Sequence, residues 1–124
     1  TPSLLEHTRD IILSKESMMA FVEAGFGRIP MDERKSPLVS PLYANLSLMP
    51  PALFLTGNIE QLVDDSVFMA ARWRRAGNTA ELCVVDGACH AFTIIPMGEV
   101  TDEGIDHIVR FVQKHLRPAP LRLN

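Results

Sequence analysis

Two residues with acid–base chemistry, Glu60 and His90, each follow a short apolar run. The runs, at about 52–57 and 80–85, have the length and composition of buried strands. Parallel strands that are neighbours bring their carboxyl ends to one rim of a sheet, where the sites of open α/β sheets are built. A carboxylate at that rim can hold the tautomer of an imidazole and stabilise its protonated form. The pair therefore predicts a histidine that acts as a base near neutral pH.

Both residues also have an ordinary structural interpretation. A single histidine in a loop is commonly a surface or packing residue, and a glutamate after a strand is commonly solvated. Asp64 is a second candidate acid, although its place at the start of an expected helix favours helix capping. Cys89 next to His90 suggests a cysteine–histidine dyad, but adjacent side chains tend to point apart. The sequence favours Glu60 over Asp64 as the acid.

The elements that would position these residues are strands and helices in alternation. Beyond the two strands, the pattern predicts helices at about 15–24, 64–76 and 101–115, with Ser14 capping the first and Thr101 the last. The apolar face of the last helix consists of Ile105, Ile108, Val109, Val112 and Leu116. The order strand, helix, strand, helix is a βαβ unit followed by a covering helix, and the fold class is α/β.

A sheet of two parallel strands is thin. Independent stability usually needs more strands or heavy helical cover. The run at 52–56 is apolar on both faces, as interior strands are, so one of its edges should pair with something. Residues 1–49 offer no convincing strand. We expect that the N-terminal segment covers this edge, that another chain does, or that the rest of the domain lies outside this sequence.

The bulk composition limits the possible functions. The 124 residues are 47% apolar and 22% charged with a net charge of −3, which fits one globular domain and gives no case for nucleic-acid binding. No apolar run is long enough to span a bilayer, and no signal peptide is recognised. Cys83 and Cys89 lack metal-type spacing, so we expect no cofactor or metal and a reduced, cytoplasmic chain, with a disulfide between them left open.

Several motifs in unbroken order resemble those of a known family. They are Ser40-Pro41-Leu42, Pro50-Pro51-Ala52-Leu53, Leu62-Val63-Asp64-Asp65-Ser66, Ala70-Ala71-Arg72-Trp73 and His90-Ala91-Phe92. Their order and spacing resemble the late strands and helices of hormone-sensitive-lipase-like α/β-hydrolases, a family of esterases and lipases. The resemblance implies the C-terminal part of a hydrolase fold, with residues 36–116 as the hydrolase core and 1–35 as a variable helix and loop segment.

The resemblance also implies roles for the candidate site residues. The family's triad follows the chain order serine, acid, histidine. The histidine corresponds to His90, and the acid to Glu60 in Glu60-Gln61-Leu62, where the family has Asp-Pro-Leu. Gln61 thus replaces a proline, the acid is one methylene longer than the usual aspartate, and Ala91 stands where the family has glycine. Glutamate serves as the acid in related hydrolases, so the role is retained.

The nucleophile of such an enzyme is not found in this sequence. No Gly-x-Ser-x-Gly motif and no His-Gly-Gly run occurs. Because nucleophile and oxyanion donors usually provide most of the rate, the sequence predicts part of a carboxylic-ester hydrolase that is inactive alone. The substrate of the completed enzyme would be a small carboxylic ester. The alternative is a non-catalytic remnant that acts as a binding or oligomerisation module, and the resemblance further implies a homodimer through the edge of strand 81–85.

Overall fold

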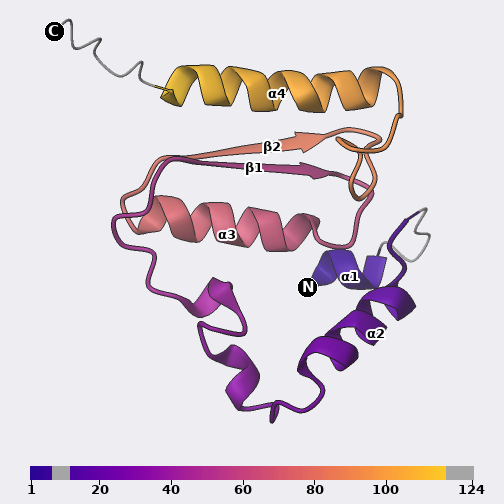
Figure 1. The fold of residues 1–124 in the computed structure, drawn as a ribbon, viewed down its shortest axis with the longest axis vertical. Coiled ribbons are helices and arrows are strands. Elements are labelled where there is room, and N and C mark those ends of the chain that lie inside the picture. The colour runs from indigo at the N-terminus through magenta and orange to yellow at the C-terminus, as the bar shows by residue number, and fades with distance from the viewer. Residues whose placement is uncertain (7–11, 117–124) are drawn as a thin grey trace, which may run out of the picture.

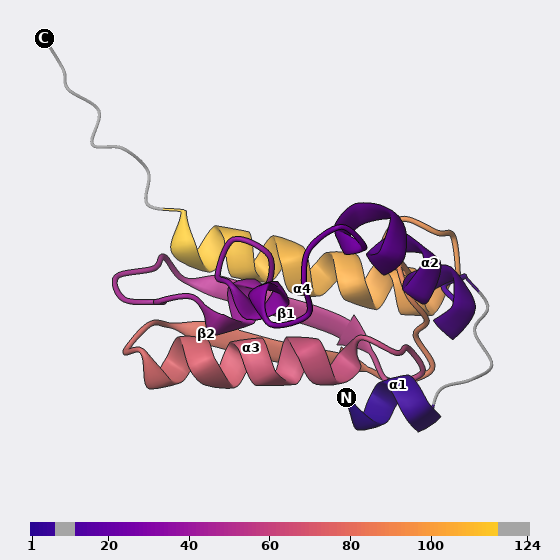
Figure 2. The same ribbon diagram turned by 90° about the horizontal axis from the view of Figure 1, so that it is seen from below.

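The computed structural model describes residues 1–6 and 12–116. Two parallel strands form a small sheet, with one long helix on each face (Figure 1). The elements in chain order are α1 (Pro2–Glu6), α2 (Lys15–Phe26), the 3-10 turns η1 (Glu33–Lys35) and η2 (Pro41–Tyr43), β1 (Ala52–Gly57), α3 (Val63–Arg75), β2 (Ala80–Val85) and α4 (Glu99–His115). The segment that precedes β1 lies below α3 in Figure 1, and in the view from below most of it lies in front of β1 and α4, beside α3 (Figure 2).

The sheet is parallel, and its two strands pair residue by residue over their whole length. Ala52 pairs with Ala80 at one end and Gly57 with Val85 at the other. Both predicted strands and the βαβα order are therefore confirmed, and so is the α/β class. Because the strands end at paired residues, the two loops that follow them leave from the same rim of the sheet.

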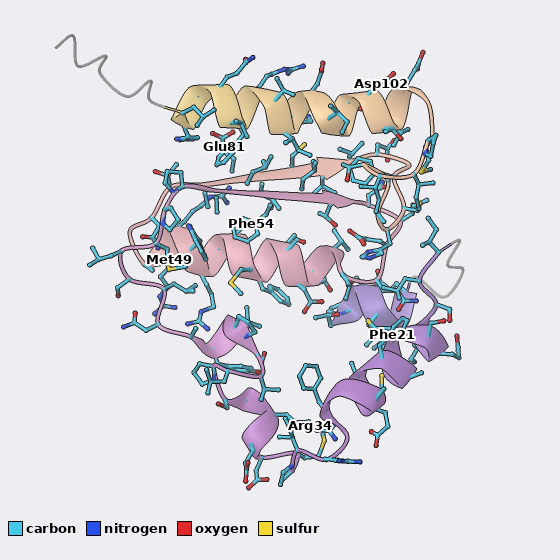
Figure 3. All side chains as sticks on the ribbon, in the orientation of Figure 1. Phe21, Arg34, Met49, Phe54, Glu81 and Asp102 are labelled. Atoms are coloured by element: carbon cyan, nitrogen blue, oxygen red, sulfur yellow. The ribbon has the colours of Figure 1, made fainter. Side chains whose placement is uncertain are left out.

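The α3 face of the sheet is packed through aromatic side chains. The ring of Phe54 meets the ring of Trp73 edge-on, with 5.7 Å between centroids, and Figure 3 shows Phe54 between β1 and α3. The indole N–H of Trp73 donates to the carbonyl of Pro50 over 2.9 Å. Ala70 is fully buried beneath the sheet. Trp73 thus fixes the crossover helix to β1.

The α4 face contains the main buried cluster, built on Val85, Ala88 and Phe92. α4 reaches it through Gly104, where an added Cβ would lie 2.5 Å from the ring of Phe92. The apolar residues predicted to form the packing face of this helix are instead exposed, namely Ile105, Ile108, Val109, Val112 and Leu116. Burial of that face is therefore not observed within the described residues, although Ile108 lines a hollow together with Leu53 and Leu55 of β1.

The start of α4 also differs from the prediction. The helix begins at Glu99, after Gly98 with a φ of 65°, and Thr101 is not its cap. The hydroxyl of Thr101 instead accepts the N–H of Met97 over 2.9 Å and lies 2.8 Å from the carbonyl oxygen of Phe92. Thr101 therefore fastens the loop that precedes the helix.

The other helices lie close to their predicted positions. α2 is capped by Ser14, which accepts the N–H of Ser17 over 3.0 Å, and it extends two residues beyond 15–24. α3 is displaced by one residue from the predicted 64–76. The sequence does not predict α1, which packs against α3.

The second edge of β1 has no strand beside it in the part of the chain that the structure describes. The N-terminal segment does not supply one, because α1 and η2 pack against α3. Within residues 1–6 and 12–116 the N-terminal segment therefore pairs no strand with this edge. No helix in these ranges is long and apolar enough to cross a membrane.

Candidate active site

The turn after β1 holds the carboxylate of Glu60 in a buried position. The residue is 7% exposed, and each of its carboxylate oxygens has defined partners. Oε1 accepts the hydroxyl of Thr56 and the backbone N–H of Gly57, the latter over 3.3 Å. Oε2 lies 2.6 Å from Nδ1 of His90. Burial of a charged group is costly unless it is hydrogen-bonded, and these three contacts satisfy that condition.

The histidine loop runs from β2 to α4 and brings the imidazole over the end of β1. The side chain of His90 is 37% exposed, so the ring is open to solvent beyond its buried contact with Glu60. Ala91 has a φ of 61°, a left-handed conformation that costs a residue with a Cβ about 1–2 kcal/mol. Phe92 is buried beneath the loop. The tightness of this turn explains why the resembled family has glycine where this chain has Ala91.

The acid loop and the histidine loop are joined directly. Asn58 donates through its side-chain amide to Asp86 and accepts the N–H of Gly87 over 2.8 Å. The N–H of Ile59 donates to the carbonyl of Ala88 over 3.3 Å. The two loops therefore behave as one unit at the rim of the sheet.

Gly57 lies where the two loops approach most closely. A Cβ at this position would be 1.9 Å from the carbonyl oxygen of Ala88, a backbone atom that cannot swing aside. Only glycine permits the acid loop to reach the histidine loop at this distance.

Asp64, the second candidate acid, has a different partner. Its Oδ2 accepts the N–H of Ser3 over 2.8 Å, and the hydroxyl of Ser3 donates to the carbonyl of Gln61 over 2.6 Å. The expected capping role is thus found on α1 rather than on α3, whose N-cap, Leu62, makes no side-chain cap bond. Of the two carboxylates, the structure brings Glu60 to His90.

Cys89 does not form the alternative dyad. It is buried, and its sulfur lies 3.4 Å from the sulfur of Met97 and 3.5 Å from the carbonyl oxygen of His90.

Cys83 is also a free thiol, and burial raises its pKa above the ordinary value, with a smaller contribution from Glu103. In the described ranges, no group of three or more histidine, cysteine or acidic side chains is placed to hold a metal ion.

The arrangement around His90 can perform proton transfer. An ionised carboxylate only accepts hydrogen bonds, so a neutral imidazole beside one carries its proton on Nδ1 and keeps a lone pair on Nε2. An open hollow of about 390 Å³ lies beside the ring, lined by apolar side chains as well as by the pair itself. The apolar lining consists of Leu53, Leu55, Ala91, Phe92 and Ile108. A base of fixed tautomer beside an apolar hollow suits general acid–base chemistry on a small uncharged molecule.

Two residues of this site, Thr56 and Asn58, were missed by the sequence reasoning. Thr56 is the only residue with a polar side chain in β1, a hydroxyl inside an otherwise apolar strand. Its position four residues before the candidate acid was the available signal. Asn58 bonds residues 28 and 29 positions further along the chain, and no local pattern reveals this partnership.

The fold is that of part of an α/β-hydrolase, and sequence comparison agrees. A family model described as alpha/beta hydrolase fold matches residues 1–94, and the chain belongs to this family. It is 30% identical over 119 residues to an ethyl acetate hydrolase of Pseudomonas putida, a match that covers 93% of this chain and 36% of that protein.

Solved structures give the same family in three dimensions. An esterase of the bacterial hormone-sensitive lipase family is 32% identical with a TM-score of 0.80, covering 93% of this chain and 38% of that one. A thermostable carboxylesterase cloned from a metagenomic library is 26% identical with a TM-score of 0.82, covering 95% and 40%. The resemblance to hormone-sensitive-lipase-like esterases is therefore confirmed, and the chain spans little more than a third of the length of these relatives.

Proposed function

We propose that this chain supplies the acid and the base of a carboxylic-ester hydrolase, Glu60 and His90. The observation that carries the proposal is the 2.6 Å contact between Oε2 and Nδ1 at the carboxyl rim of two parallel strands. Family membership and the esterase relatives support the reaction class. The nucleophilic serine and the oxyanion donors would come from polypeptide outside these 124 residues, because the sequence has no Gly-x-Ser-x-Gly motif.

In this reaction His90 transfers one proton in each step. Nε2 of His90 takes the proton of the serine hydroxyl while the serine oxygen bonds to the ester carbonyl carbon. The same nitrogen then donates that proton to the departing alcohol, which leaves an acyl-enzyme. Water then attacks the acyl carbon and gives a proton to Nε2. The histidine returns that proton to the serine oxygen, and the carboxylic acid product is released. Glu60 stabilises the imidazolium that forms at each step and keeps Nδ1 protonated throughout.

A chimeric enzyme tests the proposal. Residues 1–124 would replace the matching segment of the Pseudomonas putida ethyl acetate hydrolase, whose remaining sequence would complete the fold. We expect the chimera to hydrolyse ethyl acetate and short-chain p-nitrophenyl esters, and we expect His90→Gln to abolish turnover. The isolated chain should show no turnover above its own His90→Ala control. A folded chimera whose activity survives His90→Gln would refute the proposal.

A second candidate function, a non-catalytic binding or oligomerisation module, is favoured by the surface that this chain leaves open. β1 has an unpaired edge within the described residues, and the apolar stripe of α4 is exposed. A homodimer through the β2 edge is one form of it. A cooperative melt and a defined dimer by gel filtration would support this function, and a monomer would argue against the dimer.

We further propose a reducing, cytoplasmic setting, which the two free thiols favour. Titration of the natively purified protein with a thiol reagent under denaturing conditions should give two thiols per chain. A disulfide in the protein isolated from its source would contradict this.

A further inference from the structure

We propose that Thr56 is a positioning residue that holds the plane of the Glu60 carboxylate so that one of its oxygens faces Nδ1 of His90, and that it thereby sets the tautomer of the imidazole. The inference deepens the proposed function and rests on it. Thr56 is the second-last residue of β1, and its side chain lies on the side of the Glu60 carboxylate away from His90. It has no contact with the imidazole in the described hydrogen-bond network.

The two carboxylate oxygens of Glu60 have separate tasks. Oε1 receives two donors, the Thr56 hydroxyl and the Gly57 N–H, while Oε2 is left for Nδ1 of His90. The terminal torsion of a glutamate is broad and roughly two-fold, so the side chain does not by itself fix the plane of its carboxylate. The donors on Oε1 supply that orientation.

The hydroxyl of Thr56 is suited to this task because it is buried. The residue is 1% exposed, and the shorter of its hydrogen bonds is to Glu60, with the carbonyl of Gly57 at 3.4 Å as the other partner. Water cannot readily replace a donor at such a depth. The neighbouring strand positions are apolar, so no other side chain of β1 can act in its place.

A purely structural role for Thr56 would depend on its volume and not on its hydroxyl. Two substitutions separate these possibilities. Thr56→Val keeps the shape and removes the donor, whereas Thr56→Ser keeps the donor and removes a methyl group. If the hydroxyl orients the carboxylate, the serine variant preserves the state of His90 even though it leaves a small void, and the valine variant does not.

The readout is the imidazole tautomer, measured from the ¹⁵N chemical shifts of His90 in the full 124-residue chain at a pH where the ring is neutral. The His90→Gln variant assigns the signals. We expect the Nδ1–H form in the parent and in Thr56→Ser. In Thr56→Val we expect the ratio of Nδ1–H to Nε2–H forms to fall about tenfold, the equivalent of about 1.4 kcal/mol. Circular dichroism of each variant checks that it is folded.

The results distinguish the two proposals. A folded Thr56→Val chain with the parent's tautomer ratio, or a higher one, would overturn the role of Thr56 and leave Glu60 and His90 as a pair. A parent chain without the Nδ1–H form would overturn both. If the valine variant does not fold, the parent still provides a test, because a buried, bonded hydroxyl should give a slowly exchanging Thr56 proton with a nuclear Overhauser contact to Glu60. Rapid exchange of that proton would overturn the proposal.

Discussion

Replacement of Glu60 by glutamine should reverse the tautomer of His90. The variant keeps the size of the side chain and turns one acceptor oxygen into a donor. Gly57 N–H is fixed in the backbone and can only donate, so the glutamine carbonyl should take the place of Oε1. The amide NH₂ then occupies the place of Oε2 and donates to Nδ1, which forces the proton onto Nε2.

The size of the effect follows from the alternative orientation. If the amide were turned the other way, its NH₂ would face the N–H of Gly57, and a buried donor would lose its acceptor. An unsatisfied buried group costs about 1–3 kcal/mol, so a central value of about 2 kcal/mol favours the first orientation roughly 30-fold. The Nε2–H form should therefore dominate in Glu60→Gln. A histidine held in that tautomer has no lone pair for the serine, and in a complete serine hydrolase the wrong tautomer costs about 10⁴ in turnover.

The assay is the same ¹⁵N measurement, and the chain offers a matched control. Asp64→Asn makes the identical change of carboxylate to amide in a residue that bonds Ser3 instead of the imidazole. It should leave the tautomer of His90 unchanged. Retention of the Nδ1–H form in Glu60→Gln would refute the reasoning. Loss of that form in Asp64→Asn would also refute it and would make Asp64 the better candidate acid.

Gly57→Ala, with Gly25→Ala as its control, tests the packing around the site, and Glu81→Gln tests the charge pair between β2 and α4. Gly57→Ala places a Cβ 1.9 Å from the carbonyl oxygen of Ala88, so we expect it to lower the free energy of unfolding in urea by about 2 kcal/mol or more, whereas Gly25→Ala, with open space around it in α2, should stabilise by about 0.5–1 kcal/mol. The hydrogen bond from Lys114 lowers the pKa of Glu81 below the ordinary 4.5, so the stability that it contributes is present at neutral pH and lost as the pH falls through and below 4.5. Glu81→Gln should therefore cost less than about 0.5 kcal/mol at neutral pH, with the difference from the parent vanishing in acid, and a cost that persists in acid would contradict the assignment.

The strands were predictable from the sequence because their signals are local. Each is a short apolar run bounded by turn residues, and both bounds were found. The pairing of Glu60 with His90 was predictable for a related reason. Once the runs are accepted as parallel neighbours, topology alone brings the residues that follow them to one rim.

What was missed depends on partners that are distant in the sequence. α1 has five residues, too few to be stable through local propensity, and its first-turn amide at Ser3 is accepted by Asp64, 61 residues later. Thr101 resembles a helix cap in the sequence, yet its hydroxyl is used by the loop before the helix. No pattern within one segment contains either fact.

The face of α4 shows how a valid local pattern can mislead. Its apolar period is real, but the close approach of the helix is to the histidine loop at Gly104, because only a glycine there admits the ring of Phe92. The apolar stripe is left exposed in this chain. Apolar spacing identifies the apolar stripe of a helix, but it does not show which residues of that stripe are buried within this chain.

A double-mutant cycle in the chimeric esterase tests most directly whether Glu60 and His90 act as one catalytic unit. The turnover number would be measured for Glu60→Ala, for His90→Ala and for the combined variant. Residues that act as a unit are strongly non-additive, so the combined variant should be no slower than His90→Ala alone. Losses that simply multiply would show that the two side chains act independently, and this would contradict the account.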